Sequence, residues 1–136
     1  MMKQENELFA DVQLCGDTAS TGSGVVETDI IDLQVTKAAK CDKALVGGRI
    51  CYTGTIINNS DVDFITGEQG PVTIRDPLAS NVEYIAGTFE YTIGSGQPVQ
   101  DEPDIDGNNE MTYELEIPAG ETVIVEFCVK VLSVPA

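Results

Sequence analysis

The four cysteines are the main side chains in this sequence that could do covalent chemistry. The chain of 136 residues contains no histidine, which excludes Ser-His-Asp triads, histidine acid/base catalysis and histidine-containing zinc sites. Zinc bound by cysteines alone favours CxxC pairs, whereas Cys15, Cys41, Cys51 and Cys128 are spread along the chain. We therefore expect disulfide bonds, no cofactor and no enzymatic activity; the simpler alternative is four separate buried thiols.

An acidic segment, DIDGNNE, resembles the opening of an EF-hand calcium loop. The oxygen ligands that it offers are those of Asp104, Asp106, Asn108 and Glu110. An EF-hand also needs glycine at position 6 and a bidentate glutamate at position 12, where this chain has Asn109 and Leu115. The pattern favours a solvated acidic loop, with looser calcium binding as the alternative.

The overall charge limits the partners. The chain has 23 acidic and 7 basic residues, for a net charge of −16. Nucleic-acid binding needs clustered Lys and Arg, but the basic residues are scattered from Lys3 to Lys130. No apolar run approaches the ~20 residues of a membrane span, and residues 1–6 lead into no apolar signal core. We therefore expect neither nucleic acid nor membrane as a partner, and we interpret the acidity as an aid to solubility.

β-Strands must position these side chains, because apolar residues recur with a period of two. The clearest case is 49–58 (RICYTGTIIN), where Tyr52, Gly54, Ile56 and Asn58 share one face. Similar runs are predicted at 31–37, 72–75, 82–86, 88–93, 111–117 and 123–131, with a long acidic loop at 94–109 and no helix. Short strands at this spacing predict an all-β antiparallel sandwich of about seven strands over residues 29–136.

Residues 1–28 differ from the rest and are predicted to form an N-terminal arm. A short strand is expected at 7–15, with Leu8, Ala10, Val12 and Leu14 on one side. Residues 16–24 (GDTASTGSG) have the composition of a flexible linker, with a reach of about 30 Å when fully extended. A strand on such a linker can fold back onto its own sheet edge or dock onto another copy.

Several motifs then follow in a characteristic order. They are Val35-Thr36-Lys37, Gly48 with Tyr52, 56–59 (IINN), 72–78 (VTIRDPL), 82–88 (VEYIAGT), 117–120 (IPAG) and 125–131 (VEFCVKV). This ordered set, within residues 31–132, resembles the bacterial conserved-repeat domain known as domain of unknown function eleven. The resemblance implies an immunoglobulin-like sandwich of the kind strung in tandem on Gram-positive and archaeal surface proteins, as stalks and adhesive modules.

The chain departs from that family by having a single copy, an added arm, several cysteines and no signal peptide or cell-wall anchor. It resembles the subunits of appendages on Firmicutes spores, which are made without a signal inside a mother cell that later lyses. The resemblance implies an extracellular or spore-surface location and a fibre whose partners are other copies of the chain. Leu8, Ala10, Val12 and Leu14 would add a strand to the next subunit. The alternative is an adhesive or ligand-binding module, monomeric or at a fibre tip, with loop 94–109 as its contact surface.

The cysteines fit into this picture as links between subunits. Alternation turns Cys51 and Cys128 outward, and in a simple immunoglobulin-like order their strands lie in different sheets, so a bond between them within one molecule is not expected. We hypothesise that Cys15 bonds to Cys51 or Cys128 of a neighbour. A Cys41–Cys51 bond in the first hairpin is the main alternative, and all three pairings of four cysteines stay open.

One further covalent link is suggested by Lys37, Asn58 and Asp76. Related surface sandwiches contain spontaneous Lys–Asn isopeptide bonds, but nothing in the sequence brings these three residues together. Asn58 has a simpler role as a side chain that caps the end of a strand.

Overall fold

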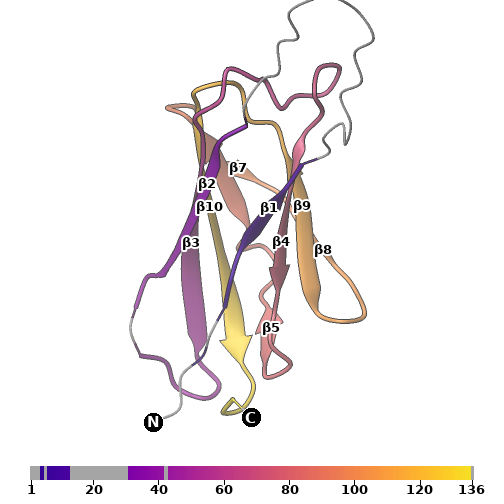
Figure 1. Ribbon diagram of the computed structural model, residues 1–136. Helices are drawn as coiled ribbons and strands as arrows, with labels where there is room; N and C mark the ends of the chain where they lie inside the picture. The colour runs from indigo at the N-terminus through magenta and orange to yellow at the C-terminus, as the bar shows by residue number, and fades with distance from the viewer. Residues whose placement is uncertain (1–3, 5, 13–30, 42, 136) are drawn as a thin grey trace, which may run out of the picture.

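The computed structural model describes residues 4, 6–12, 31–41 and 43–135, and all regular elements in these ranges are β-strands. The strands form two antiparallel sheets that face each other (Figure 1), which confirms the predicted all-β sandwich. Leu14, Cys15 and the predicted linker 16–24 lie outside the described residues. Within the described part of the chain, no helix could cross a membrane.

The smaller sheet has four strands. Their order is β1 (Phe9–Asp11), β4 (Val72–Pro77), β9 (Glu110–Leu115) and β8 (Asp104–Ile105). The larger sheet has six strands. Five of them follow the order β2 (Leu33–Ala39), β3 (Arg49–Asn58), β10 (Thr122–Val131), β6 (Glu90–Ile93) and β7 (Val99–Gln100), while β5 (Val82–Tyr84) also pairs with β10.

The core lies between the sheets and is built by alternation. On β3 every second residue from Ile50 to Asn58 is buried, and on β10 the same holds from Val123 to Val131. Facing them are Val72 and Ile74 of β4, which are fully buried. The predicted inward faces of the two longest strands are therefore confirmed.

The strand count differs from the prediction of about seven, because the described residues form ten strands. The two-residue strands β7 and β8 lie inside the predicted loop 94–109, and two residues are too few for a hydrophobic period. β4 also runs beyond its expected end through Asp76 and Pro77, which pair with Met111 and Glu110. The missing N–H of Pro77 falls at the last position of that ladder, where it interrupts nothing.

Candidate functional site

The N-terminal arm docks on β4 by strand addition. β1 pairs antiparallel with β4, with Phe9 opposite Arg75 and Asp11 opposite Thr73. Without β1, β4 would be the edge of the smaller sheet and would leave the main-chain groups on one of its sides unpaired. Figure 1 shows β1, in indigo, alongside β4 and on the side of β4 that faces away from β9. We call β1 and the β4 residues with which it pairs the arm contact.

Leu8 is the buried anchor of the arm. Its side chain is 7% exposed and belongs to the core cluster, and Ala10 and Val12 pack against that cluster. Leu8 crosses to the other sheet, because a Cβ placed on Gly54 of β3 would lie 2.7 Å from Leu8 Cδ2. Burying one leucine side chain stabilises a fold by roughly 1.5–3 kcal/mol. The space above Gly54 is therefore a socket for Leu8.

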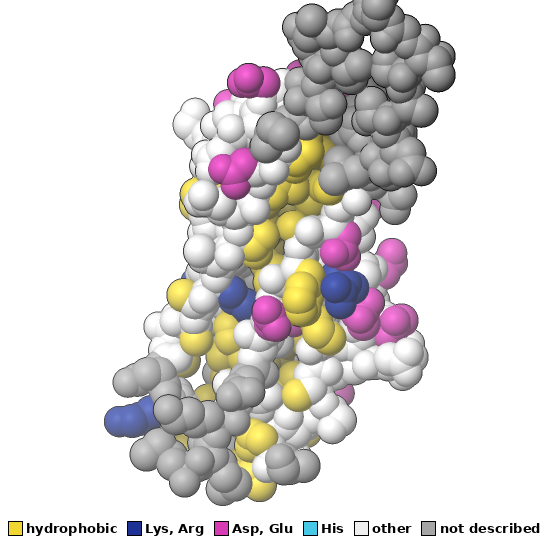
Figure 2. Space-filling view, viewed as in Figure 1, with side chains coloured by type: hydrophobic (Ala, Val, Ile, Leu, Met, Phe, Trp, Pro, Cys, Tyr) yellow, Lys and Arg dark blue, Asp and Glu magenta, His cyan; other side chains and the backbone are white. Residues whose placement is uncertain are grey.

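The outer side of the arm contact is held by Arg75. Its guanidinium lies 4.4 Å from the Phe9 ring centre, and its Nε lies 3.1 Å from Asp11 Oδ2. Figure 2 shows a basic side chain between hydrophobic and acidic ones on this face, where β1 and β4 lie. Exposed ion pairs contribute only about 0–1 kcal/mol, so these contacts orient the arm while Leu8 supplies most of its affinity.

A buried ion pair lies between the two sheets. Lys37 of β2 places its Nζ 2.5 Å from Oδ2 of Asp76 on β4, and the two side chains are 9% and 0% exposed. Lys37 Nζ also lies 4.2 Å from the ring centre of Tyr52 and 5.1 Å from that of Phe127. The pair therefore sits among aromatic rings, in a region of low polarity.

Burial moves both groups of this pair toward their neutral forms. It lowers the pKa of the Lys37 amine, although the neighbouring carboxylate works in the opposite direction. It raises the pKa of the Asp76 carboxyl, against the opposing influence of Lys37 and of a hydrogen bond from the Asn6 side chain. Desolvation is the larger effect on each group.

Asn6 brings the arm to the same place. It precedes Leu8 by two residues and thus belongs to the same alternating face of the extended arm. Its Oδ1 atom and Asp76 Oδ1 are both buried and accept no hydrogen bond from the described residues. Buried polar atoms are nearly always paired, so two unpaired oxygens, one on Asp76 and one on the Asn6 side chain that interacts with Asp76, mark an unusual site.

Asn58 does not join this site. Its side-chain amide donates to the carbonyl groups of Val62, Ile117 and Pro118, and its Oδ1 accepts from the Ser60 N–H. Asn58 therefore caps the end of β3, which was its simpler predicted role. The structure brings Lys37 and Asp76 together and leaves Asn58 out.

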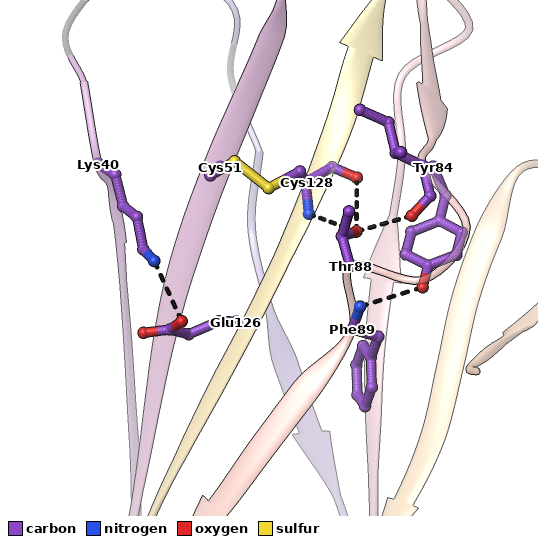
Figure 3. The surroundings of a disulfide bond; sticks show 8 residues. Lys40, Cys51, Tyr84, Thr88, Phe89, Glu126 and Cys128 are labelled. Carbon is purple, nitrogen blue, oxygen red and sulfur yellow. Dashed lines mark hydrogen bonds and ion pairs between the residues drawn. A yellow bond between two sulfur atoms is a disulfide. The ribbon is translucent and has the colours of Figure 1, made fainter. Parts of the chain in front are cut away.

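Cys51 and Cys128 form a disulfide within the molecule (Figure 3). Both side chains point away from the core, as predicted, but the expectation that their strands lie in different sheets was wrong. β3 and β10 are neighbours, and Cys128 stands directly opposite Cys51. The Cys128 main-chain groups bond to Thr88 and Ile85 on the far side of β10. In an antiparallel ladder such a residue pair lacks mutual hydrogen bonds and has its side chains closest.

This bond corrects two predicted pairings. Cys51 and Cys128 are unavailable to Cys15 of a neighbour, and Cys41 does not bond to Cys51. Cys41 is an exposed free thiol. Cys15 lies outside the described residues, so Cys41 is the one described cysteine that remains open for a link to another subunit.

The acidic segment forms the hairpin between β8 and β9. Asp106 Oδ1 accepts hydrogen bonds from the N–H groups of Asn108 and Glu110. Asn109 has a left-handed φ of 61° and its side chain donates to the carbonyls of Ala79 and Val82. Asp104 lies in the same segment. Among the described residues, no group of three or more His, Cys, Asp or Glu side chains is placed so that it could hold a metal ion. The polar groups of this segment thus build a turn.

Some of these residues carried little sequence signal. Gly54 stood out only as a glycine at an inward position of a core strand, and Asn6 only by its spacing from Leu8. Arg75 appeared only as one residue of the 72–78 motif, without a predicted role of its own. Comparison of the chain with known proteins identified no relative: no family model, no curated protein and no solved structure matches it. The two-sheet fold and the docked arm together define an all-β sandwich completed by its own N-terminal strand.

Proposed function

We propose that this chain is a structural subunit of a self-assembling fibre on an extracellular or spore surface. The arm of one subunit would add its strand to β4 of the next. The observation that carries the proposal is the arm contact itself, because the short strand β1 covers a sheet edge and the neighbouring Leu8 fills a socket above Gly54.

Exchange of the arm between copies needs no new contacts. An identical copy offers the same β4 edge and the same socket for Leu8, and 18 residues, 13–30, connect the arm to the described part of the sandwich. Exchange of an identical element is a low-cost route to assembly, and a head-to-tail contact that does not close gives filaments. Because the arm competes with its own sandwich, assembly should increase with protein concentration.

Disulfide links between subunits, if formed, would use the two cysteines outside the internal bond. Cys51 and Cys128 are joined to each other, which leaves Cys41 and Cys15. In a fibre these thiols would reinforce the joint after the arm has docked. Their electrophoretic signature would be a ladder that collapses with a thiol reductant.

The test compares two leucines in the full-length chain by electron microscopy. Leu8→Asp places a charge in the core, whereas Leu45→Asp changes a side chain that is 81% exposed. Both variants add one negative charge, so net repulsion is matched. We expect filaments from the wild type and from Leu45→Asp, and dispersed particles from Leu8→Asp. Filaments from Leu8→Asp, or from a chain lacking residues 1–24, would refute arm addition.

The second candidate is a monomeric adhesive or ligand-binding module, and the pairing of the arm with its own chain favours it. Its contact surface would be the segment 94–109, which Tyr113 holds to the sheet through a 2.7 Å hydrogen bond to Asp101. Dispersed wild-type monomers at all concentrations would favour this candidate over the fibre.

A further inference from the structure

Three side chains from three segments meet at the seam between the sheets. Lys37 comes from β2, Asp76 from β4, and Asn6 from the arm just before β1. Lys37 is bound to Asp76 Oδ2 at 2.5 Å, and Asn6 hydrogen-bonds the same carboxyl. An amine, an acid and a primary amide are thus held in one buried place.

The surroundings favour reaction over a simple ion pair. The rings of Tyr52 and Phe127 lie against the amine, and a region of low polarity disfavours charge on both partners. A neutral amine is a nucleophile and a neutral carboxyl is a proton donor. Asn6 Oδ1 and Asp76 Oδ1 have no partner among the described residues, so both are available to accept a proton.

We propose that Lys37 and Asn6 become joined by an amide bond, with Asp76 carrying the protons. Lys37 passes a proton to the Asp76 carboxylate, and its neutral Nζ attacks Cγ of Asn6. Asp76 protonates Oδ1 of the tetrahedral intermediate and takes back the second amine proton. The C–Nδ2 bond then breaks as Asp76 returns a proton to Nδ2, and the proton on Oδ1 passes to Asp76 as the C=O bond re-forms. One amide bond replaces another, ammonia leaves, and no oxidant or reductant is needed.

Asn6 suits the role of acyl group better than Asp76. If Asp76 were the acyl group, a second acid would be needed to protonate the leaving oxygen. Among the described residues, the buried polar and charged side chains are Asn58, Ser60, Asp76 and Asn81, so Asp76 is the only buried acid. Asn6 supplies a carbonyl that Asp76 can activate directly.

Because Asn6 lies on the arm, the amide bond would attach the arm covalently to a sandwich. Within one chain it would fix the arm to its own sandwich. If the arm is exchanged as proposed above, the same reaction would join each subunit covalently to the next; only this extension rests on the proposed function. The bond would form after docking, since Leu8 must first bring Asn6 to the seam.

Mass spectrometry of the reduced, denatured full-length protein tests the bond. We expect the wild type to be lighter than its sequence by one ammonia for each bond formed, whether the arm is its own or exchanged. Asn6→Ala, Lys37→Arg and Asp76→Asn should each have full mass, and Asn108→Ala, in an exposed turn, should still lose ammonia. Lys37 in an amide bond resists trypsin, so fragmentation should find residues 4–40 uncut at Lys37 and linked to Asn6.

Each outcome is decisive. Full mass in the wild type overturns the proposal, and loss of one water places the bond between Lys37 and Asp76 instead. Ammonia loss that persists in Lys37→Arg means cyclisation of an asparagine elsewhere and also overturns it. Reducing electrophoresis distinguishes failure of the amide proposal from failure of the fibre proposal. Monomers that carry the internal amide bond support the amide proposal and refute exchange of the arm. Filaments whose subunits have full mass support the fibre proposal and refute the amide bond.

Discussion

Leu8 of the arm occupies the space that Gly54 leaves open on the central strand β3, and a Cβ at Gly54 would lie 2.7 Å from Leu8 Cδ2. Gly54→Val should therefore expel Leu8 while β3 keeps a residue that favours strands. Losing that burial costs roughly 1.5–3 kcal/mol, or about a ten- to hundredfold rise in arm opening. Hydrogen exchange of the β1 amides measures this.

The control is Gly107→Ala, because a Cβ there meets nothing within 4 Å. In addition, Gly54→Ala should be less harmful in a Leu8→Ala background than alone, since side chains in contact are energetically coupled. Additive effects would show that Leu8 does not use the socket above Gly54.

A second prediction concerns the Lys37–Asp76 ion pair, in an Asn6→Ala background where the proposed amide cannot form. Lys37→Met leaves Asp76 buried without its cation, and breaking a buried pair in this way costs about 3–5 kcal/mol. Replacing both partners, Lys37→Met with Asp76→Leu, removes both buried charges and should cost much less. Urea unfolding compares the three proteins, and equal losses for the single and double variants would contradict the prediction.

The pH dependence of the same pair has a definite sign. Burial holds the pKa of Asp76 above its ordinary value in the folded protein, so between the two values the folded state binds more protons than the unfolded state. The stability contributed by Asp76 is thus fully present below about pH 4 and is lost as the pH rises through the folded-state pKa. In the acid range above about pH 4, the unfolding free energy of Asn6→Ala, minus that of Asn6→Ala/Lys37→Met/Asp76→Leu, should fall with rising pH; at alkaline pH the lowered pKa of Lys37 acts in the opposite direction. A difference that grows would mean that Lys37 holds Asp76 ionised.

Cys51 and Cys128 give a fourth prediction. Their sequence separation is 77 residues, and disulfides closing loops of this kind typically stabilise by about 2–4 kcal/mol. Cys51→Ser/Cys128→Ser should lose that much in urea unfolding, while Cys41→Ser should lose almost nothing. If ladders appear on non-reducing electrophoresis, Cys41→Ser should weaken them and the double serine variant should not.

The sequence predicted what depends on local alternation and missed what depends on pairing at a distance. Tyr52, Ile56, Phe127 and Val129 face the core as their period required. No such pattern states which strand lies beside β3, so the pairing of β3 with β10, and with it the Cys51–Cys128 bond, was missed.

The site formed by Lys37, Asp76 and Asn6 between the two sheets illustrates the same limit of sequence-based prediction. Lys37 and Asp76 could be singled out by residue type, but only the closing of the two sheets brings Nζ to Oδ2. Asn6 lies outside the strand that it accompanies and precedes a segment of weak alternation. Asn6 lies near Asp76 because Leu8 is buried above Gly54. That burial is a tertiary contact, which no local sequence pattern predicts.

The position of the internal disulfide limits how far a subunit could stretch under load. Tension applied to the two ends of the chain would reach Cys51 and Cys128, and the segment between them, 77 residues in separation, could not be drawn out while the sulfurs stay bonded. At about 3.5 Å per residue, roughly 270 Å of contour length is withheld. A pulled subunit could therefore extend by less than half of its full contour length before it stiffens.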